Sequence, residues 1–104
     1  MIRYEVVAEV PPEARDSFAR FQTERHIPDV LASGCFLSAA FEEEADGRFR
    51  ASYVAADAEA LERYLREHAP ALRADFAAHA PAGVRLSRGT WTTVRRWDAG
   101  PLSR

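Results

Sequence analysis

A turn at Ala45-Asp46-Gly47 separates two extended runs, residues 35–44 and 48–55. Three-residue hairpin loops favour Gly at the left-handed position, so the chain is expected to reverse at Asp46-Gly47. Placing Glu44 opposite Arg48 fixes the register and sorts the cross-strand pairs onto two faces. The polar face pairs Glu42 with Arg50, Ala40 with Ser52 and Ser38 with Val54, and the apolar face pairs Phe41 with Ala51 and Ala39 with Tyr53. A shift of one residue would destroy both patterns, so the register is strongly specified.

Two further segments have the composition of strands. Residues 2–10 alternate between apolar and mainly polar positions, which predicts a strand with one buried face. The apolar positions are Ile2, Tyr4, Val6, Ala8 and Val10. A last extended segment covers residues 84–97, and its alternation breaks near Gly89, where a bulge is expected.

Two amphipathic helices are predicted between these strands. The first follows Pro11-Pro12 and reaches about residue 31, with a kink or an end near Ile27 imposed by Pro28. Gly34 then releases the chain into the hairpin. The second helix has Asp57 as its N-cap and stops at residues 81–83. Its core positions are expected to be Leu61, Leu65, Leu72 and Phe76.

The order strand, helix, hairpin, helix, strand predicts an α+β protein with the ferredoxin-like βαββαβ fold and a four-stranded antiparallel sheet. Both helices are expected on the apolar face, so the other face of the sheet has no cover from this chain. We call this uncovered surface the open face. It should carry Arg3, Glu5, Val7, Glu9, Ser38, Glu42, Arg50, Ser52 and Val54. Two copies stacked through their open faces, as a closed homodimer, are the simplest closure.

Size and composition indicate a single domain of an ordinary globular protein. The chain has 104 residues, 47% of them hydrophobic, and a net charge of −2. We assign residues 1–97 to one domain and residues 98–104 to a flexible tail. The near-neutral charge predicts neither nucleic acid nor membrane as a partner, and the lone Cys35 excludes an internal disulfide. With no signal-like N-terminus and no run of about 18 apolar residues, a cytoplasmic protein is expected.

Two motifs carry a resemblance to a known family. They are His26-Ile27-Pro28-Asp29-Val30 leading to Gly34-Cys35-Phe36, and Tyr64-Leu65-Arg66-Glu67-His68-Ala69-Pro70 followed by Leu72-Arg73. Over nearly the whole chain, the sequence resembles a bacterial family of proteins of unassigned function in the dimeric α/β barrel superfamily. The resemblance implies a ferredoxin-like protomer and a homodimer, and it implies no catalytic residues. That superfamily includes cofactor-free monooxygenases, polyketide cyclases, muconolactone isomerases, haem-degrading enzymes and ligand-sensing domains, so the fold does not fix the function.

The three histidines are the first candidates for chemistry. Each of His26, His68 and His79 precedes a proline by two residues. On a structural interpretation, the imidazoles meet carbonyl groups that the prolines free near the helix ends. On a functional interpretation, His26 and His68 occupy matching late positions of the two helices and act as acid and base. No metal site is predicted, because the spacing of these side chains supplies too few ligands.

The final segment combines five arginines with two tryptophans. They are Arg85, Arg88, Arg95, Arg96 and Arg104, with Trp91 and Trp97. Basic residues among aromatic ones can bind single-stranded nucleic acid. Pairing with Glu5 and Glu9 of the first strand is favoured instead, because the last strand of this fold lies beside the first. A role for these arginines with an acidic ligand stays open.

The leading hypothesis is an enzyme without metal or organic cofactor that acts on a small organic molecule, as an isomerase, cyclase or monooxygenase. It would use a pocket between helices and sheet, with His26 or His68 handling protons and Glu5 with Arg50 holding polar substrate groups. Cys35 is assigned to core packing, since it follows a helix C-terminus. The alternative is a non-catalytic module that binds a small molecule or mediates interaction. A deep pocket containing an imidazole would favour the enzyme, and a close-packed interior without a cavity would favour the module.

Overall fold

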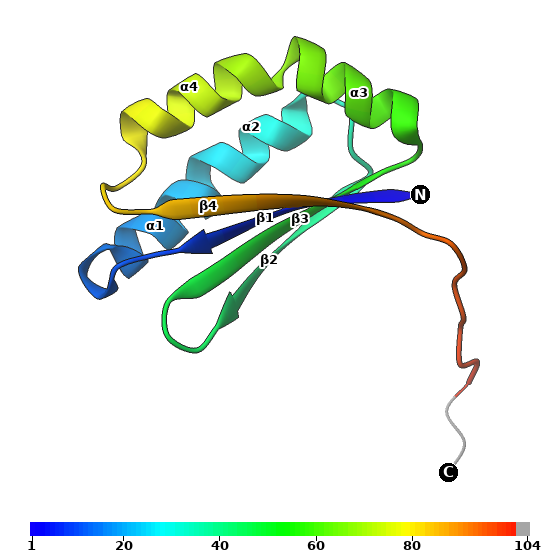
Figure 1. Cartoon of the computed structure of the whole chain (residues 1–104), viewed down its shortest axis with the longest axis horizontal. Helices are drawn as coiled ribbons and strands as arrows, with labels where there is room; N and C mark the ends of the chain where they lie inside the picture. The colour runs from blue at the N-terminus through cyan, green and yellow to red at the C-terminus, as the bar shows by residue number, and fades with distance from the viewer. Residues whose placement is uncertain (102–104) are drawn as a thin grey trace.

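The computed structural model describes residues 1–101 as one antiparallel sheet covered on one side by helices (Figure 1). The strands are β1 (Ile2–Glu9), β2 (Ser38–Glu44), β3 (Arg48–Ala55) and β4 (Arg85–Thr92), in the order β2-β3-β1-β4. The helical segments are η1 (Pro12–Ala14), α1 (Arg15–Phe21), η2 (Gln22–His26), α2 (Ile27–Ala32), α3 (Ala58–Glu67) and α4 (Ala69–His79). This confirms the predicted ferredoxin-like fold. Residues 102–104 of the predicted tail lie outside the described residues, and the domain limit at residue 97 stays a prediction.

The hairpin register is confirmed at every predicted pair, from Ser38 opposite Val54 to Glu44 opposite Arg48. Asp46 and Gly47 both have left-handed backbone angles, with φ of 74° and 76°. Gly47 has a second constraint, because a Cβ there would lie 2.2 Å from Nε of Arg15. The turn therefore favours glycine for its conformation, and a larger side chain there would displace the end of the Arg15 side chain.

The first helical segment does not end at Pro28. It contains a π-helical turn, η2, in which the N–H of Ile27 donates to the carbonyl of Gln22, and α2 then continues to Ala32. Pro28 lies in the first turn of α2, where its missing N–H is tolerated. The sequence predicts a kink or an end of the helix here. The structure instead has a π-helical turn just before the proline, and the helix continues.

The second predicted helix is two helices in the structure. The helix is interrupted at His68, where φ is −118°, and α4 begins with Pro70 in its first turn. Asp57 is the predicted cap of α3 and accepts from the N–H of Ala60 at 2.9 Å. Leu65, expected in the core, is 37% exposed, and Tyr64 is buried instead with 5% exposed.

The expected bulge at Gly89 is absent, because β4 pairs with β1 residue by residue from Glu9 opposite Arg85 to Ile2 opposite Thr92. The missing side chain instead gives room to Trp91, whose Nε1 would lie 3.4 Å from a Cβ at Gly89. The alternation breaks because β4 is an edge strand. Both of its faces are largely exposed, so its sequence is not held to a buried pattern.

The helices pack on the apolar face of the sheet, and the open face is uncovered (Figure 1). The core forms two clusters, one around Tyr53 and Val30 and one around Phe18 and Phe49. Phe41 packs against both clusters, so the two clusters adjoin each other.

Within residues 1–101, no helix has the length and apolarity needed to cross a bilayer.

Candidate functional site

A cavity of about 220 Å³ lies between the helices and the apolar face of the sheet. Its walls combine aliphatic and aromatic groups with a small set of polar side chains. The lining residues are Tyr4, Val6, Gln22, His26, Ala51, Tyr53, Tyr64, Leu72, Arg73, Phe76, Ala77, Leu86 and Arg88. An apolar pocket with a few convergent polar groups is the usual form of a small-molecule site.

His26 reaches this cavity from the π-helical turn. Its ring stacks on Phe21 at 5.9 Å between centroids and meets Phe76 edge-on at 5.2 Å. The Nδ1 atom is buried and has no hydrogen-bond partner among the described residues. Burial lowers the pKa of His26, while the charges of Asp75 and Asp29 oppose the shift and that of Arg88 adds to it. The imidazole is therefore neutral near pH 7 and able to accept a proton.

Gln22 stands one turn before His26 on the same segment. Only 4% of its surface is exposed, and its Oε1 has no partner within residues 1–101. Leaving a buried acceptor unpaired costs stability, so such atoms are uncommon in folded proteins. π-helical turns occur frequently at functional sites, and this turn carries two buried polar atoms without partners on two residues of the cavity lining.

Three tyrosines supply further polar groups. Tyr4 and Tyr53 lie on β1 and β3, and Tyr64 on α3, with neighbouring rings about 6 Å apart. Burial is the main cause that raises the pKa of Tyr64 to about 12, and burial likewise raises that of Tyr53. Both hydroxyls therefore stay protonated at neutral pH and can donate to a ligand oxygen.

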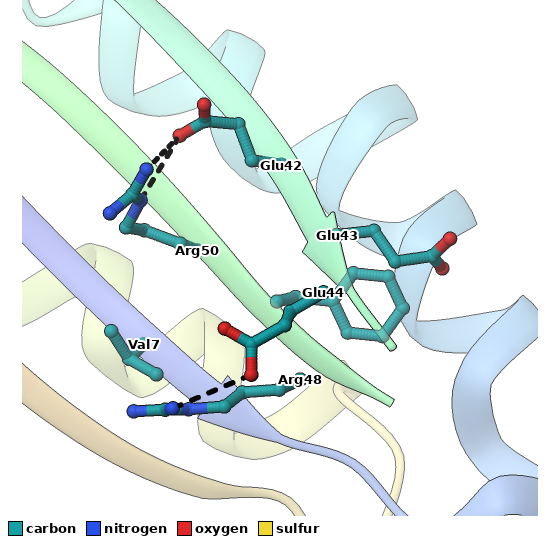
Figure 2. A pocket seen from close by; sticks show the side chains of 7 residues that line it. Val7, Glu42, Glu43, Glu44, Arg48 and Arg50 are labelled. Atoms are coloured by element: carbon teal, nitrogen blue, oxygen red, sulfur yellow. Dashed lines mark hydrogen bonds and ion pairs between the residues drawn. The ribbon is translucent and has the colours of Figure 1, made fainter. Parts of the chain in front are cut away.

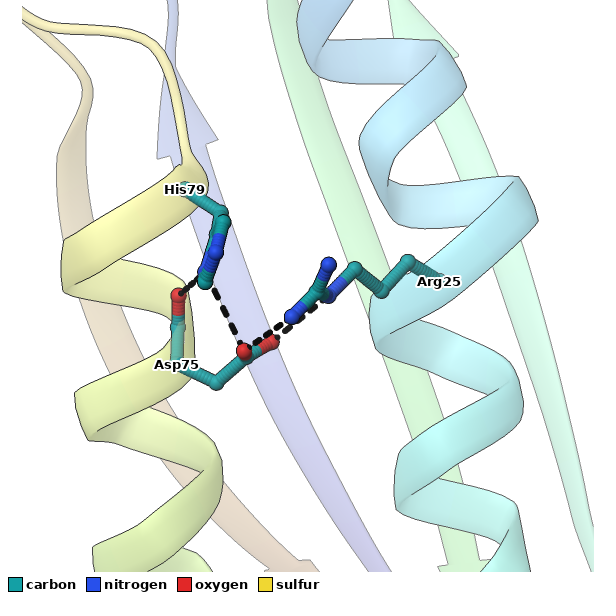
Figure 3. A network of polar contacts seen from close by, with 3 residues as sticks. All are labelled: Arg25, Asp75 and His79. Atoms are coloured by element: carbon teal, nitrogen blue, oxygen red, sulfur yellow. Dashed lines mark hydrogen bonds and ion pairs between the residues drawn. The ribbon is translucent and has the colours of Figure 1, made fainter.

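A polar network clamps the two helical segments beside His26 (Figure 3). Nε of Arg25, on η2, donates to Oδ2 of Asp75 on α4 at 3.0 Å, and an Nη2 contact makes the pair bidentate. His79 lies 3.0 Å from the carbonyl of Asp75 and 3.1 Å from its carboxylate. The Arg25 guanidinium lowers the pKa of Asp75. His79 thus meets a backbone carbonyl near a helix end, although this carbonyl belongs to Asp75 and not to Ala77, whose i+4 partner is Pro81.

The structure places the four predicted site residues in different regions. Of these, only His26 lines the cavity. His68 lies at the break between α3 and α4, with its ring stacked on Tyr64 at 6.4 Å. Glu5 and Arg50 lie on the open face, where Glu5 is 3.9 Å from Arg3 and Arg50 is 2.9 Å from Glu42. Glu5 and Arg50 thus share the open face on the neighbouring strands β1 and β3, and the structure brings neither of them to His26 or His68.

The open face has its own shallow hollow, of about 380 Å³ (Figure 2). Figure 2 shows Glu42 pointing toward Arg50, and Glu44 toward Arg48 at 3.7 Å. The predicted charge pairs thus form within one protomer. The hollow is bordered mainly by charged groups that already satisfy one another.

Several groups were missed by sequence reasoning. Gln22 is four residues before His26, so their shared helix face was available as a signal, but a buried glutamine cannot be told from an exposed one by spacing. Arg88 is at an even-numbered position of the last strand, which places it on the helix side of the sheet. Arg85 is on the other side, where its partner is Glu9 at 3.4 Å. Residues 1–101 contain no group of three His, Cys, Asp or Glu side chains able to hold a metal ion.

Comparison with known proteins places the chain in a family. Residues 1–90 match the family described as "Domain of unknown function (DUF4286)". No curated protein matches the sequence.

Solved structures show the same fold at low sequence identity. A protein of unknown function from Nitrosomonas europaea is 16% identical, with a TM-score of 0.62 over 93% of this chain and 94% of that one. A proposed antibiotic biosynthesis monooxygenase from Deinococcus radiodurans is 10% identical, with a TM-score of 0.69 over 94% and 97%. A variant of SnoaB, a cofactor-independent oxygenase from Streptomyces nogalater, is 16% identical, with a TM-score of 0.69 over 91% and 94%. The chain therefore has the same α+β, ferredoxin-like fold as these solved structures.

Proposed function

Because the chain belongs to the DUF4286 family, whose function is unknown, we propose a function from its own cavity: a cofactor-free enzyme that removes a proton from a small organic molecule. The proton acceptor is His26. The observation that carries the proposal is the imidazole of His26, which belongs to the lining of a ligand-sized cavity and whose buried Nδ1 has no partner among the described residues. An isomerase, a cyclase and a monooxygenase can each begin with this step.

The chemistry follows from the surroundings of the imidazole. A neutral imidazole takes the proton of an activated C–H bond, and the bonding electron pair passes into the substrate as an enolate. The protonated hydroxyls of Tyr53 and Tyr64 donate to the enolate oxygen, where negative charge develops. A cavity of about 150 Å³ holds a benzene molecule, so 220 Å³ suits one ring with its substituents.

Two observations support an enzyme over a module without chemistry. The fold is shared with SnoaB, which is described as a cofactor-independent oxygenase. The interior also contains a cavity with an imidazole. This is the feature that was expected to favour the enzyme over the module.

The other predicted site residues receive indirect roles in this proposal. His68 positions Tyr64 through the stacked rings and does not touch the ligand. Glu5 and Arg50 belong to the open face, through which we propose that two protomers form a homodimer.

Hydrogen–deuterium exchange tests the proposal without knowledge of the natural substrate. Phenylpyruvate and acetoacetanilide, two small carbon acids, are incubated with the protein in D2O, and loss of the acidic C–H signal is followed by proton NMR. The wild-type protein is expected to accelerate exchange of at least one of them. His26→Gln is expected to lower that acceleration about a hundredfold or more, the usual contribution of a general base.

His79→Gln is the matched control, since its imidazole lies outside the cavity lining and has no role in the proposed chemistry. This variant should keep most of the acceleration, and circular dichroism checks that each variant is folded. Exchange that His26→Gln leaves unchanged would overturn the assignment of the base. Binding of both compounds without any exchange would support the non-catalytic module instead.

A further inference from the structure

The charge of the cavity lining differs from that of the whole chain. The chain carries 16 acidic and 14 basic residues, whereas the lining contains Arg73 and Arg88 and no Asp or Glu. The cavity is therefore a cationic site in a protein with a net charge of −2.

Arg73 and Arg88 are both exposed to solvent. Like Arg15, Arg20, Arg63 and Arg95, they form no ion pair with a carboxylate among residues 1–101. Within residues 1–101, every ion pair between Arg and a carboxylate involves other residues, so neither Arg73 nor Arg88 has a carboxylate within 4.0 Å. Arg25, by contrast, is satisfied by Asp75. Nη2 of Arg73 donates to the Tyr4 hydroxyl at 3.2 Å, which holds this guanidinium at the cavity wall and leaves its other N–H groups available.

The two arginines approach the cavity from opposite layers. Arg73 is on α4 in the helical layer, and Arg88 is on β4 in the sheet, opposite Val6 of β1. The charges of both lower the pKa of Tyr64, which burial raises, and the charge of Arg88 also acts on His26. The charges of both arginines thus act on residues that line the same cavity as the proposed base.

We propose that the cavity selects small organic carboxylates, with the carboxylate held by Arg73 and Arg88 and the apolar body packed between sheet and helices. The planar guanidinium fork matches carboxylate geometry, and a cation without a protein partner gains most from an anionic ligand. Val6, Leu72, Phe76 and Leu86 supply apolar walls for a ring. This inference rests on the proposed function, because it assumes that the cavity receives the substrate.

Binding of benzoate and benzamide to the whole chain tests the inference. The two probes have nearly the same shape and differ in charge, so their affinities isolate the effect of the carboxylate. Titration calorimetry is expected to give a dissociation constant at least tenfold lower for benzoate than for benzamide. Inorganic phosphate is the third probe, and weak binding of it is expected because it offers no apolar body. Equal affinities for benzoate and benzamide, or preferential binding of phosphate, would overturn the inference.

Arg73→Gln and Arg88→Gln should each weaken benzoate binding about tenfold and leave benzamide binding unchanged. Arg66→Gln is the matched control, because Arg66 is an exposed α3 residue outside the cavity lining and should have no effect. Shifts of the Arg73 and Arg88 Nε–H signals on adding benzoate to the wild-type protein give a second measurement that needs no variant. Benzoate binding that survives both substitutions would exclude this anion site.

The outcomes separate this inference from the proposed function. Exchange that depends on His26, together with no preference for benzoate, would overturn the substrate class and leave the base in place. Preference for benzoate that depends on the arginines, without exchange, would support the anion site and contradict the enzyme.

Discussion

Gln22 illustrates how a site can be kept at the expense of stability. Its side chain is 4% exposed, and Oε1 has no partner among the described residues. An unpaired buried acceptor costs on the order of 1–3 kcal/mol, and part of that cost disappears when the group is replaced by an apolar one of the same shape. We therefore expect Gln22 to be unfavourable for folding and favourable for binding.

Gln22→Met tests this trade between stability and function. The variant conserves length and volume, so it is expected to raise the free energy of unfolding by about 1 kcal/mol, or the melting temperature by about 4 °C. Urea unfolding of both proteins measures the change. The same variant should bind ligand more weakly, as thermal-shift titration with benzoate would show. A variant less stable than wild type would mean that Gln22 is satisfied in solution and has no such cost.

His26 gives a prediction about pH. Its pKa is lowered from the ordinary value of 6.5, mainly by burial, so below that pH the unfolded chain binds a proton that the folded chain resists. The free energy of unfolding should therefore fall as the pH drops from about 7 to about 5, and rise again on return. Asp75, whose pKa is also lowered, loses its stabilising effect only at lower pH, below its ordinary value of 3.8.

Urea unfolding of wild type and His26→Gln across this range measures the effect. The wild-type protein should lose more stability on acidification than the variant, and NMR titration of the ring should give a pKa below 6.5. The base needed for proton abstraction is the neutral form, so exchange should also slow below this pH. Parallel stability curves for the two proteins would contradict a buried neutral imidazole.

At the scale of elements, the hairpin could be predicted because three independent patterns agree there. The turn residues Asp46 and Gly47 favour positive φ, the two runs alternate with period two, and charge complementarity between Glu42 and Arg50 selects one register. Each pattern is local in sequence. None of the three patterns favours a different register, so the pairing could be predicted residue by residue.

The helical layer was less predictable because its details depend on long-range packing. Apolar spacing cannot distinguish a continuous helix from two helices that meet at His68, or a π-helical turn from an α-helical one. Tyr64 and Leu65 are adjacent in α3 and both are large, so apolar spacing does not show that Tyr64 is the one buried. Prolines mark these positions in the sequence, and the backbone response to each depends on its surroundings.

The candidate site could be predicted in kind and only partly in its residues. A pocket between helices and sheet with a histidine was expected, and His26 lies in one. Arg73 and Arg88 were not placed there, because they come from elements that are close only after folding. Glu5 and Arg50 were grouped with a pocket between helices and sheet, although strand periodicity assigns both residues to the open face on the other side of the sheet.

At the scale of the whole molecule, the open face combines satisfied charges with apolar groups that one chain leaves uncovered. Glu42 pairs with Arg50 and Glu9 with Arg85 within the protomer. Val7 and Val54 are half-buried on this face, and Trp91 is 62% exposed. Trp91 lies beside Gly89 on the edge strand, where its indole is available to another protein surface. Since aromatic side chains contribute most to protein interfaces, we expect Trp91 to anchor the proposed homodimer.

Trp91→Ser is therefore expected to weaken self-association at least tenfold, since truncation of an interface tryptophan commonly costs about 2 kcal/mol or more. Sedimentation equilibrium at micromolar concentration measures the dissociation constant. Leu65→Ser is the matched control, because it removes an exposed apolar side chain from the helical layer and should leave association unchanged. A wild-type protein that is monomeric at this concentration would contradict the homodimer. Equal effects of the two substitutions would contradict the open face as its interface.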